Sequence, residues 1–98
     1  MFYLCNSLTS IILSNLDTQK VLSMRGLFGY CSSLTSIDIS NFNTEKAINM
    51  YGTFNGCTHL KYLFIHNFIT SSVNYMGWMF TDCFSLTSLC KRYENYVW

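Results

Sequence analysis

Residues 28–44 read FGYCSSLTSIDISNFNT, and this stretch contains the pattern that decides the fold. Ile37 and Ile39 stand two positions apart, so they share one face of an extended strand. Ser36 and Asp38 share the other face. Together with Leu34, the two isoleucines form the spacing L-x-x-I-x-I. This spacing predicts a short strand with one buried face and one polar face.

The same stretch recurs with a period of 26 residues and without any gap. Further apolar, Thr, Asn and Met positions recur in the same register. Three columns keep one residue type in every unit: Phe2, Phe28, Phe54 and Phe80; Cys5, Cys31, Cys57 and Cys83; and Leu8, Leu34, Leu60 and Leu86. Such ladders are typical of a repeat protein in which each unit packs on the next one.

The period and the L-x-x-L-x-L core both lie within the range of leucine-rich repeats. Identical strands joined by long connections pair in parallel. We therefore expect an α/β leucine-rich-repeat solenoid with a parallel sheet of about four short strands. The strands are expected near residues 11–14, 37–40, 63–66 and 86–89. Apolar spacings of three and four in the connections predict short helical turns.

The solenoid is expected to occupy residues 1–90, as about 3.7 repeats of 26 residues. Residues 91–98 break the pattern and are interpreted as a degenerate cap or tail. Because the sequence begins in the middle of a unit, we expect it to be a fragment of a longer array. Exposed solenoid ends leave strand edges unpaired, so self-association through these ends is also expected.

The composition limits the classes of partner. The chain has 98 residues, enough for one small domain, and its net charge is +1 with six basic and five acidic side chains. These charges are scattered singly, which argues against nucleic acid as a partner. No apolar run approaches the length of about 20 residues that a membrane span needs.

The unit resembles the BspA-like leucine-rich repeats of bacterial and protist surface proteins, including repeats of mycoplasma lipoproteins. The match is closest over residues 27–44 and extends over residues 1–90. The resemblance implies a non-catalytic protein-interaction or adhesion module at the cell surface or in secreted form, with a protein or surface ligand as partner. No export signal is visible in this chain, so a structural spacer segment and a cytoplasmic leucine-rich-repeat scaffold remain alternatives.

The cysteines and histidines are interpreted as structural rather than catalytic. Four cysteines share one column, and they are either buried free thiols or disulfides between neighbouring units; parallel side chains favour free thiols. Cys90 lies outside this column. Cys57 and His59 could form a nucleophile–base pair on paper, but His59 occupies a position that is otherwise Ser. We expect no enzyme activity, no metal site and no cofactor.

The candidate partner-binding patch lies on the outer face of the third strand. Tyr62, Phe64 and His66 occupy the positions at which the second unit carries Ser36, Asp38 and Ser40, and Lys61 stands beside them. Large exposed aromatic residues are costly at a surface and are typical anchors of protein interfaces. The alternative is that a neighbouring copy or a further repeat covers this face.

Overall fold

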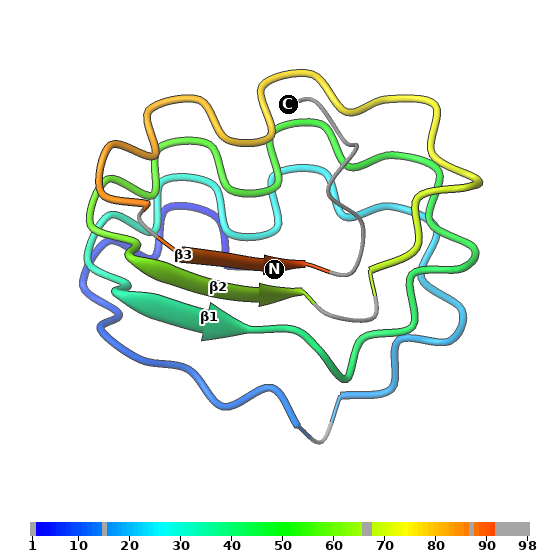
Figure 1. Cartoon of the computed structure of the whole chain (residues 1–98), viewed down its shortest axis with the longest axis horizontal. Helices are drawn as coiled ribbons and strands as arrows, with labels where there is room; N and C mark the ends of the chain where they lie inside the picture. Colours follow the sequence, from blue (N-terminus) through cyan, green and yellow to red (C-terminus); the bar gives the residue numbers. More distant parts are fainter. Residues whose placement is uncertain (1, 15, 66–67, 87, 92–98) are drawn as a thin grey trace.

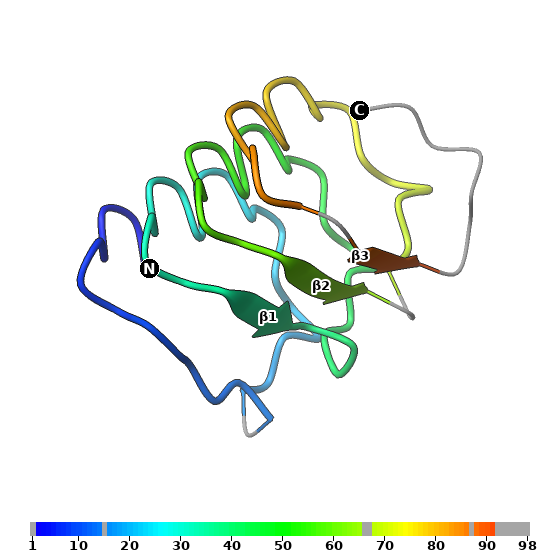
Figure 2. The ribbon, with the colours of Figure 1, turned by 60° about the vertical axis from the view of Figure 1, so that its left-hand side comes forward.

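The computed structural model describes residues 2–14, 16–65, 68–86 and 88–91, the last four by their backbone alone. Three strands form one parallel sheet in the order β1-β2-β3: β1 (Ser36–Asp38), β2 (Tyr62–Ile65) and β3 (Ser88–Lys91). Successive coils of the chain lie on one another, and the strands occupy equivalent places in their coils (Figures 1 and 2). No helix in the described part of the chain is long and apolar enough to cross a membrane.

The pairing register of the sheet equals the period of the sequence. Ser36 pairs with Tyr62, and Tyr62 pairs with Ser88, an offset of 26 positions at each step. A second column of parallel bridges joins Ser23, Asn49 and Tyr75 away from the sheet. Each unit is therefore one coil that is held to its neighbour both by the sheet and by hydrogen bonds away from the sheet.

The expected helical turns are not present among the described residues, whose connections consist of tight turns. The backbone N–H groups of Met24, Gly26 and Phe28 donate to carbonyls of the next coil at 2.7–2.9 Å. The residues between them donate three positions back, as Leu27 does to Met24 at 3.1 Å. An α-helix bonds each N–H to a carbonyl of its own segment. Here every second N–H is bonded to the next coil, so an α-helix does not form.

These turns place equivalent residues in the left-handed backbone region. One column comprises Gly26, Gly52 and Trp78 with φ near +60°, and the other comprises Leu4, Tyr30, Gly56 and Asp82 with φ between +57° and +79°. Residues other than glycine are strained in this region, because their Cβ comes close to the backbone carbonyl oxygen. Since the conformation recurs with Leu, Tyr, Trp and Asp, the coil imposes it rather than the residue type.

The first coil departs from the predicted strands, because residues 11–14 form no strand. A hollow of about 220 Å³ lies between this segment and β1, lined by Ile12 and Asp38 among others. The hollow separates the two segments, and Ile12 is 88% exposed. The predicted tail also changes, because its first residue, Lys91, is the end of β3. The remaining residues, 92–98, lie outside the described residues.

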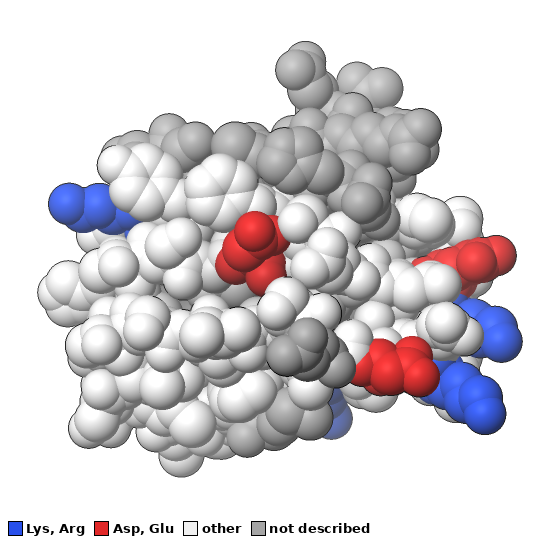
Figure 3. Space-filling model, turned by 90° about the horizontal axis from the view of Figure 1, so that it is seen from below, with Lys and Arg blue, Asp and Glu red and all other residues white. Residues whose placement is uncertain are grey.

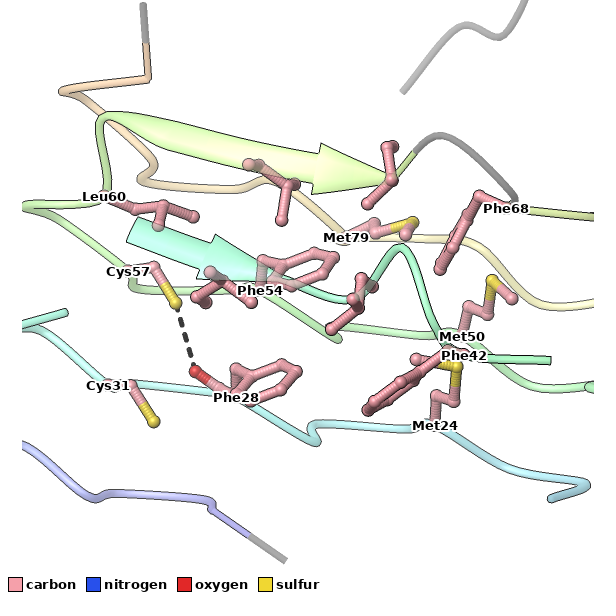
Figure 4. Packing of buried hydrophobic residues seen from close by; sticks show 14 of the residues in the cluster. Met24, Phe28, Cys31, Phe42, Met50, Phe54, Cys57, Leu60, Phe68 and Met79 are labelled. Atoms are coloured by element: carbon pink, nitrogen blue, oxygen red, sulfur yellow. Dashed lines mark hydrogen bonds between the residues drawn. The ribbon is translucent and has the colours of Figure 1, made fainter. Parts of the chain in front are cut away.

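The core runs through the middle of the stacked coils. Phe2, Phe28, Phe54 and Phe80 form a continuous stack with ring centroids 5.5–5.6 Å apart and nearly parallel planes. Leu63 and Ile65 of β2 are buried against this stack, as are Met24 and Met50 (Figure 4). The spacing of the rings is somewhat larger than the distance of about 4.8 Å between neighbouring strands, and one aromatic residue per unit fills each layer.

Candidate functional site

The predicted patch lies on the outer face of β2. The side chains of β2 alternate in exposure, with Tyr62 and Phe64 on one face and buried Leu63 and Ile65 on the other. Tyr62 is 47% exposed, Phe64 is half-buried, and Lys61 is exposed beside them. His66, the fourth member of the patch, lies outside the described residues.

The neighbouring strand gives this patch a polar border. In the pairing with β1, Ser36 stands beside Tyr62 and Asp38 stands beside Phe64. The Asp38 carboxylate accepts hydrogen bonds from the N–H and the hydroxyl of Ser40 at 3.0 and 2.6 Å. The result is a small aromatic strip with a polar edge, which suits contact with an apolar side chain of a partner.

The side chains of this patch offer hydrogen-bond donors and apolar contact area. The hydroxyl of Tyr62 and the ammonium of Lys61 can donate hydrogen bonds, and the two rings supply apolar area. In the view of Figure 3, most of the surface belongs to uncharged residues, and the few basic side chains lie toward its edges, two of them side by side and next to acidic ones.

The cysteine column is part of the hydrogen-bonded frame. The thiol of Cys57 donates to the carbonyl of Phe28 at 3.1 Å (Figure 4), and the thiol of Cys83 donates to the carbonyl of Phe54 at 3.1 Å. Cys31 donates in the same way to Phe2 at 2.8 Å. Each thiol thus bonds to the backbone of the preceding coil, and Cys5, Cys31, Cys57 and Cys83 are free.

Burial makes these thiols poor nucleophiles. It raises the pKa of Cys57 to about 12 and that of Cys83 to about 11, and it also raises the pKa of Cys31. A thiol must lose its proton to attack a substrate or bind a metal ion. Among the described residues, no three His, Cys, Asp or Glu side chains come together as a metal site. The side chain of Cys90 lies outside the described part.

Cys57 and His59, the pair considered from the sequence, each contact a different backbone carbonyl. His59 Nδ1 lies 2.7 Å from the carbonyl of Ser32 in the preceding coil. One coil earlier, the hydroxyl of Ser33 donates to the equivalent carbonyl, that of Asn6, at 2.6 Å. His59 therefore contacts the same backbone carbonyl as the serine of its column does one coil earlier.

A second group of aromatic residues was missed from the sequence. A hollow of about 440 Å³ lies away from the sheet, next to the Ser23–Asn49–Tyr75 bridges, and is lined by Arg25, Asn49, Tyr51 and Tyr75. Trp78 stacks on Tyr51 with centroids 6.0 Å apart. The signal was available in the columns, because Tyr75 follows Ser23 and Asn49, and Trp78 follows Gly26 and Gly52.

Comparison with known proteins gives one result. Neither the curated proteins nor the solved structures compared with the chain contain a match. The family described as "Mycoplasma protein of unknown function, DUF285" matches residues 1–96, nearly the whole chain. With its gapless period of 26 residues and the coils that follow it, this chain therefore belongs to that mycoplasma-type repeat family.

Proposed function

We propose that the chain is a non-catalytic protein-interaction or adhesion module of the BspA-like, leucine-rich-repeat kind, within a larger cell-surface protein. The observation that supports this most is the pair Tyr62 and Phe64 on the outer face of β2. A strand pair with an aromatic strip on one strand and Ser and Asp on the other presents a flat surface that a partner can cover.

The state of the other reactive groups is consistent with binding rather than catalysis. The thiols of Cys31, Cys57 and Cys83 are protonated at neutral pH, since burial raises their pKa values. His59 is engaged with backbone carbonyl oxygen. The proposed contact residues on the sheet face are Tyr62 and Phe64, with Lys61 at their edge.

The test compares adhesion of the chain with that of a variant lacking the strip. Beads carrying the chain are applied to cultured epithelial cells and to immobilised extracellular-matrix proteins. In the variant, Tyr62→Ser introduces the residue of the second unit. Position 64 is changed to Thr rather than Asp, because Asp would stand beside Asp38 in the neighbouring strand and the two carboxylates would repel.

The proposal expects wild-type beads to bind at least one of these surfaces and the double variant to lose that binding. Phe84→Ser is the matched control, since it removes an exposed aromatic residue outside the strands and away from the hollow, in a column that otherwise contains Asn6, Ser32 and Thr58. Equal binding by the wild type and the double variant would show that the adhesive surface lies outside the aromatic strip. If neither binds, the structural spacer is the better description.

The free thiols favour a cytoplasmic scaffold as a second candidate function, because thiols persist in reducing compartments. A thiol titration after unfolding separates the two locations. Protein isolated from its natural source under alkylating conditions should show five titratable thiols as a scaffold, whereas fewer thiols would indicate oxidation outside the cell.

A further inference from the structure

The hollow beside the Ser23–Asn49–Tyr75 bridges is built by side chains from three successive coils. Arg25 lies over the ring of Tyr51, 5.6 Å from its centroid, and Trp78 stacks on the same tyrosine at an interplanar angle of 24°. Gly77 allows this approach, because a Cβ at that position would lie 3.1 Å from the Tyr51 ring. We call the hollow lined by Arg25, Asn49, Tyr51 and Tyr75, together with Trp78 at its border, the aromatic hollow.

The aromatic residues of the hollow are costly for the fold. Trp78 has φ of +58° at a position where the two preceding coils have glycine, and its side chain is 62% exposed. Tyr75 is 59% exposed in a column that otherwise contains Ser23 and Asn49. Exposed aromatic rings in columns that otherwise contain glycine or polar residues are typical of binding surfaces.

The polar groups of the hollow define what it can bind. Asn49 Oδ1 accepts the Tyr51 N–H at 2.9 Å, so the amide nitrogen of Asn49 remains a donor at the wall of the hollow. The guanidinium of Arg25 presents several N–H donors, and its positive charge disfavours a cationic ligand such as a quaternary ammonium group. Because Arg25 and Trp78 both pack against Tyr51, the exposed ring area is that of Tyr75 and Trp78, and hydrogen-bond donors stand beside it.

We propose that the aromatic hollow binds a pyranose ring of an uncharged carbohydrate. A sugar ring has an apolar C–H face, which suits the electron-rich faces of Tyr and Trp, and a rim of hydroxyl groups that can accept from Asn49 and Arg25. The volume of about 440 Å³ lies within the range of small-ligand pockets. This site is distinct from the sheet-face strip and does not depend on the function proposed for that strip.

A proline-rich peptide is the main competitor, since such peptides also dock on aromatic residues. An extended peptide with three residues per turn needs a long groove that engages several prolines in succession. The hollow is lined by only four residues in two neighbouring columns, which fits one ring or two better than a peptide.

The test titrates the full chain with tetrasaccharides built from glucose, galactose, mannose or N-acetylglucosamine. Binding is followed by the NMR signals of the two tryptophan indole N–H groups and, since Trp78→Gly removes one of them, by the backbone amide signal of Tyr51, which every variant keeps. At least one sugar is expected to shift the Trp78 signal saturably with a millimolar Kd. Tyr75→Ser and Trp78→Gly each introduce a residue that its own column already contains, so both variants should fold, and the circular dichroism spectrum checks this.

Each variant is expected to weaken sugar binding at least about tenfold, because the rings are the anchors of the site. Tyr62→Ser, on the sheet face, should leave the sugar Kd unchanged. Absence of any shift at about 20 mM sugar, well above the expected Kd, would overturn the proposal. Sugar binding that both hollow variants retain would overturn it as well. A proline decapeptide that binds in place of the sugars would also overturn it and reassign the hollow to peptides.

Discussion

The first coil and the middle coils contain the same residue types in the same columns, yet they are packed differently. Leu34 and Leu60 are fully buried, whereas Leu8 is half-buried, and the Cys and Phe columns show the same contrast. The difference is the number of neighbours, because the middle coils are covered on both sides. Burial in this protein is therefore a property of position in the stack, as in other repeat proteins.

The largest effect is expected from placing a charge in a middle coil. Loss of a buried leucine side chain costs about 2–5 kcal/mol, and a buried carboxylate without a partner adds to that cost. Leu34→Asp should therefore abolish cooperative thermal unfolding followed by circular dichroism. Leu8→Asp should only lower the melting temperature, since water reaches that position.

Thr35→Asp is the control for charge alone, because its exposed side chain lies next to Leu34 in sequence. It should unfold almost like the wild type. Cooperative unfolding of the Leu34→Asp chain would contradict the assignment of this column to the core.

A second test uses the pH dependence of stability to measure how well a middle coil is shielded from water. The pKa of Cys57 is raised by burial to about 12, so the folded state favours the protonated thiol. This contribution to stability is complete below the ordinary thiol pKa of 9.0 and is lost as the pH rises from 9.0 towards 12. The free energy of unfolding in urea should therefore fall more steeply between pH 8 and about 10.5 in the wild type than in Cys57→Ala.

Parallel pH curves for the two chains would show that Cys57 is not shielded as the structure describes. Thiol reagents give an independent measurement at pH 8. Cys5, in the partly covered first coil, should react before Cys57, which is fully buried.

The period alone predicts which residues stand beside one another, because a gapless repeat places residues 26 apart at equivalent points of successive coils. Ser36 beside Tyr62 is one such pair. The limits of the strands could not be predicted as well, since they depend on neighbours: residues 11–14 carry the pattern but form no strand.

The connections and the second site escaped prediction for physical reasons. Apolar spacings of three and four occur both in helices and in successive tight turns, and only the hydrogen bonds between coils distinguish them. Tyr62 and Phe64 differ from the other residues of their columns and lie on one strand, so the sequence alone groups them. Tyr75 and Trp78 also differ from their columns, but their approach to Arg25 and Tyr51 across three coils follows only from the fold.

The third test concerns how each coil covers the next one. A Cβ atom at Gly56 would lie only 2.5 Å from the ring of Tyr30. A Cβ atom at Gly52 would meet nothing closer than 3.8 Å. Both glycines have positive φ, so Gly52→Ala should cost about 1 kcal/mol from backbone strain alone. Gly56→Ala should cost more, because the ring must also move.

Urea denaturation of the two variants measures this difference. Combining Gly56→Ala with Tyr30→Ala should remove the steric part and leave the strain, which a double-mutant cycle resolves. Equal costs for the two single glycine variants would contradict the contact between Tyr30 and Gly56.

The smallest effect is expected at Asp82 in the last described coil, which stands in the column of Tyr30 and Gly56. Asp82 has φ of +62° and is exposed, whereas Gly56 takes this place one coil earlier. Asp82→Gly relieves a strain of about 1 kcal/mol, but glycine also gains freedom in the unfolded chain, which offsets about half of it. The expected gain is therefore about 0.5 kcal/mol in urea denaturation. Asp82→Asn removes the charge and tolerates the same backbone, so it separates electrostatics from strain. A loss of stability in Asp82→Gly with no change in Asp82→Asn would mean that the coil does not impose this conformation and that the aspartate does.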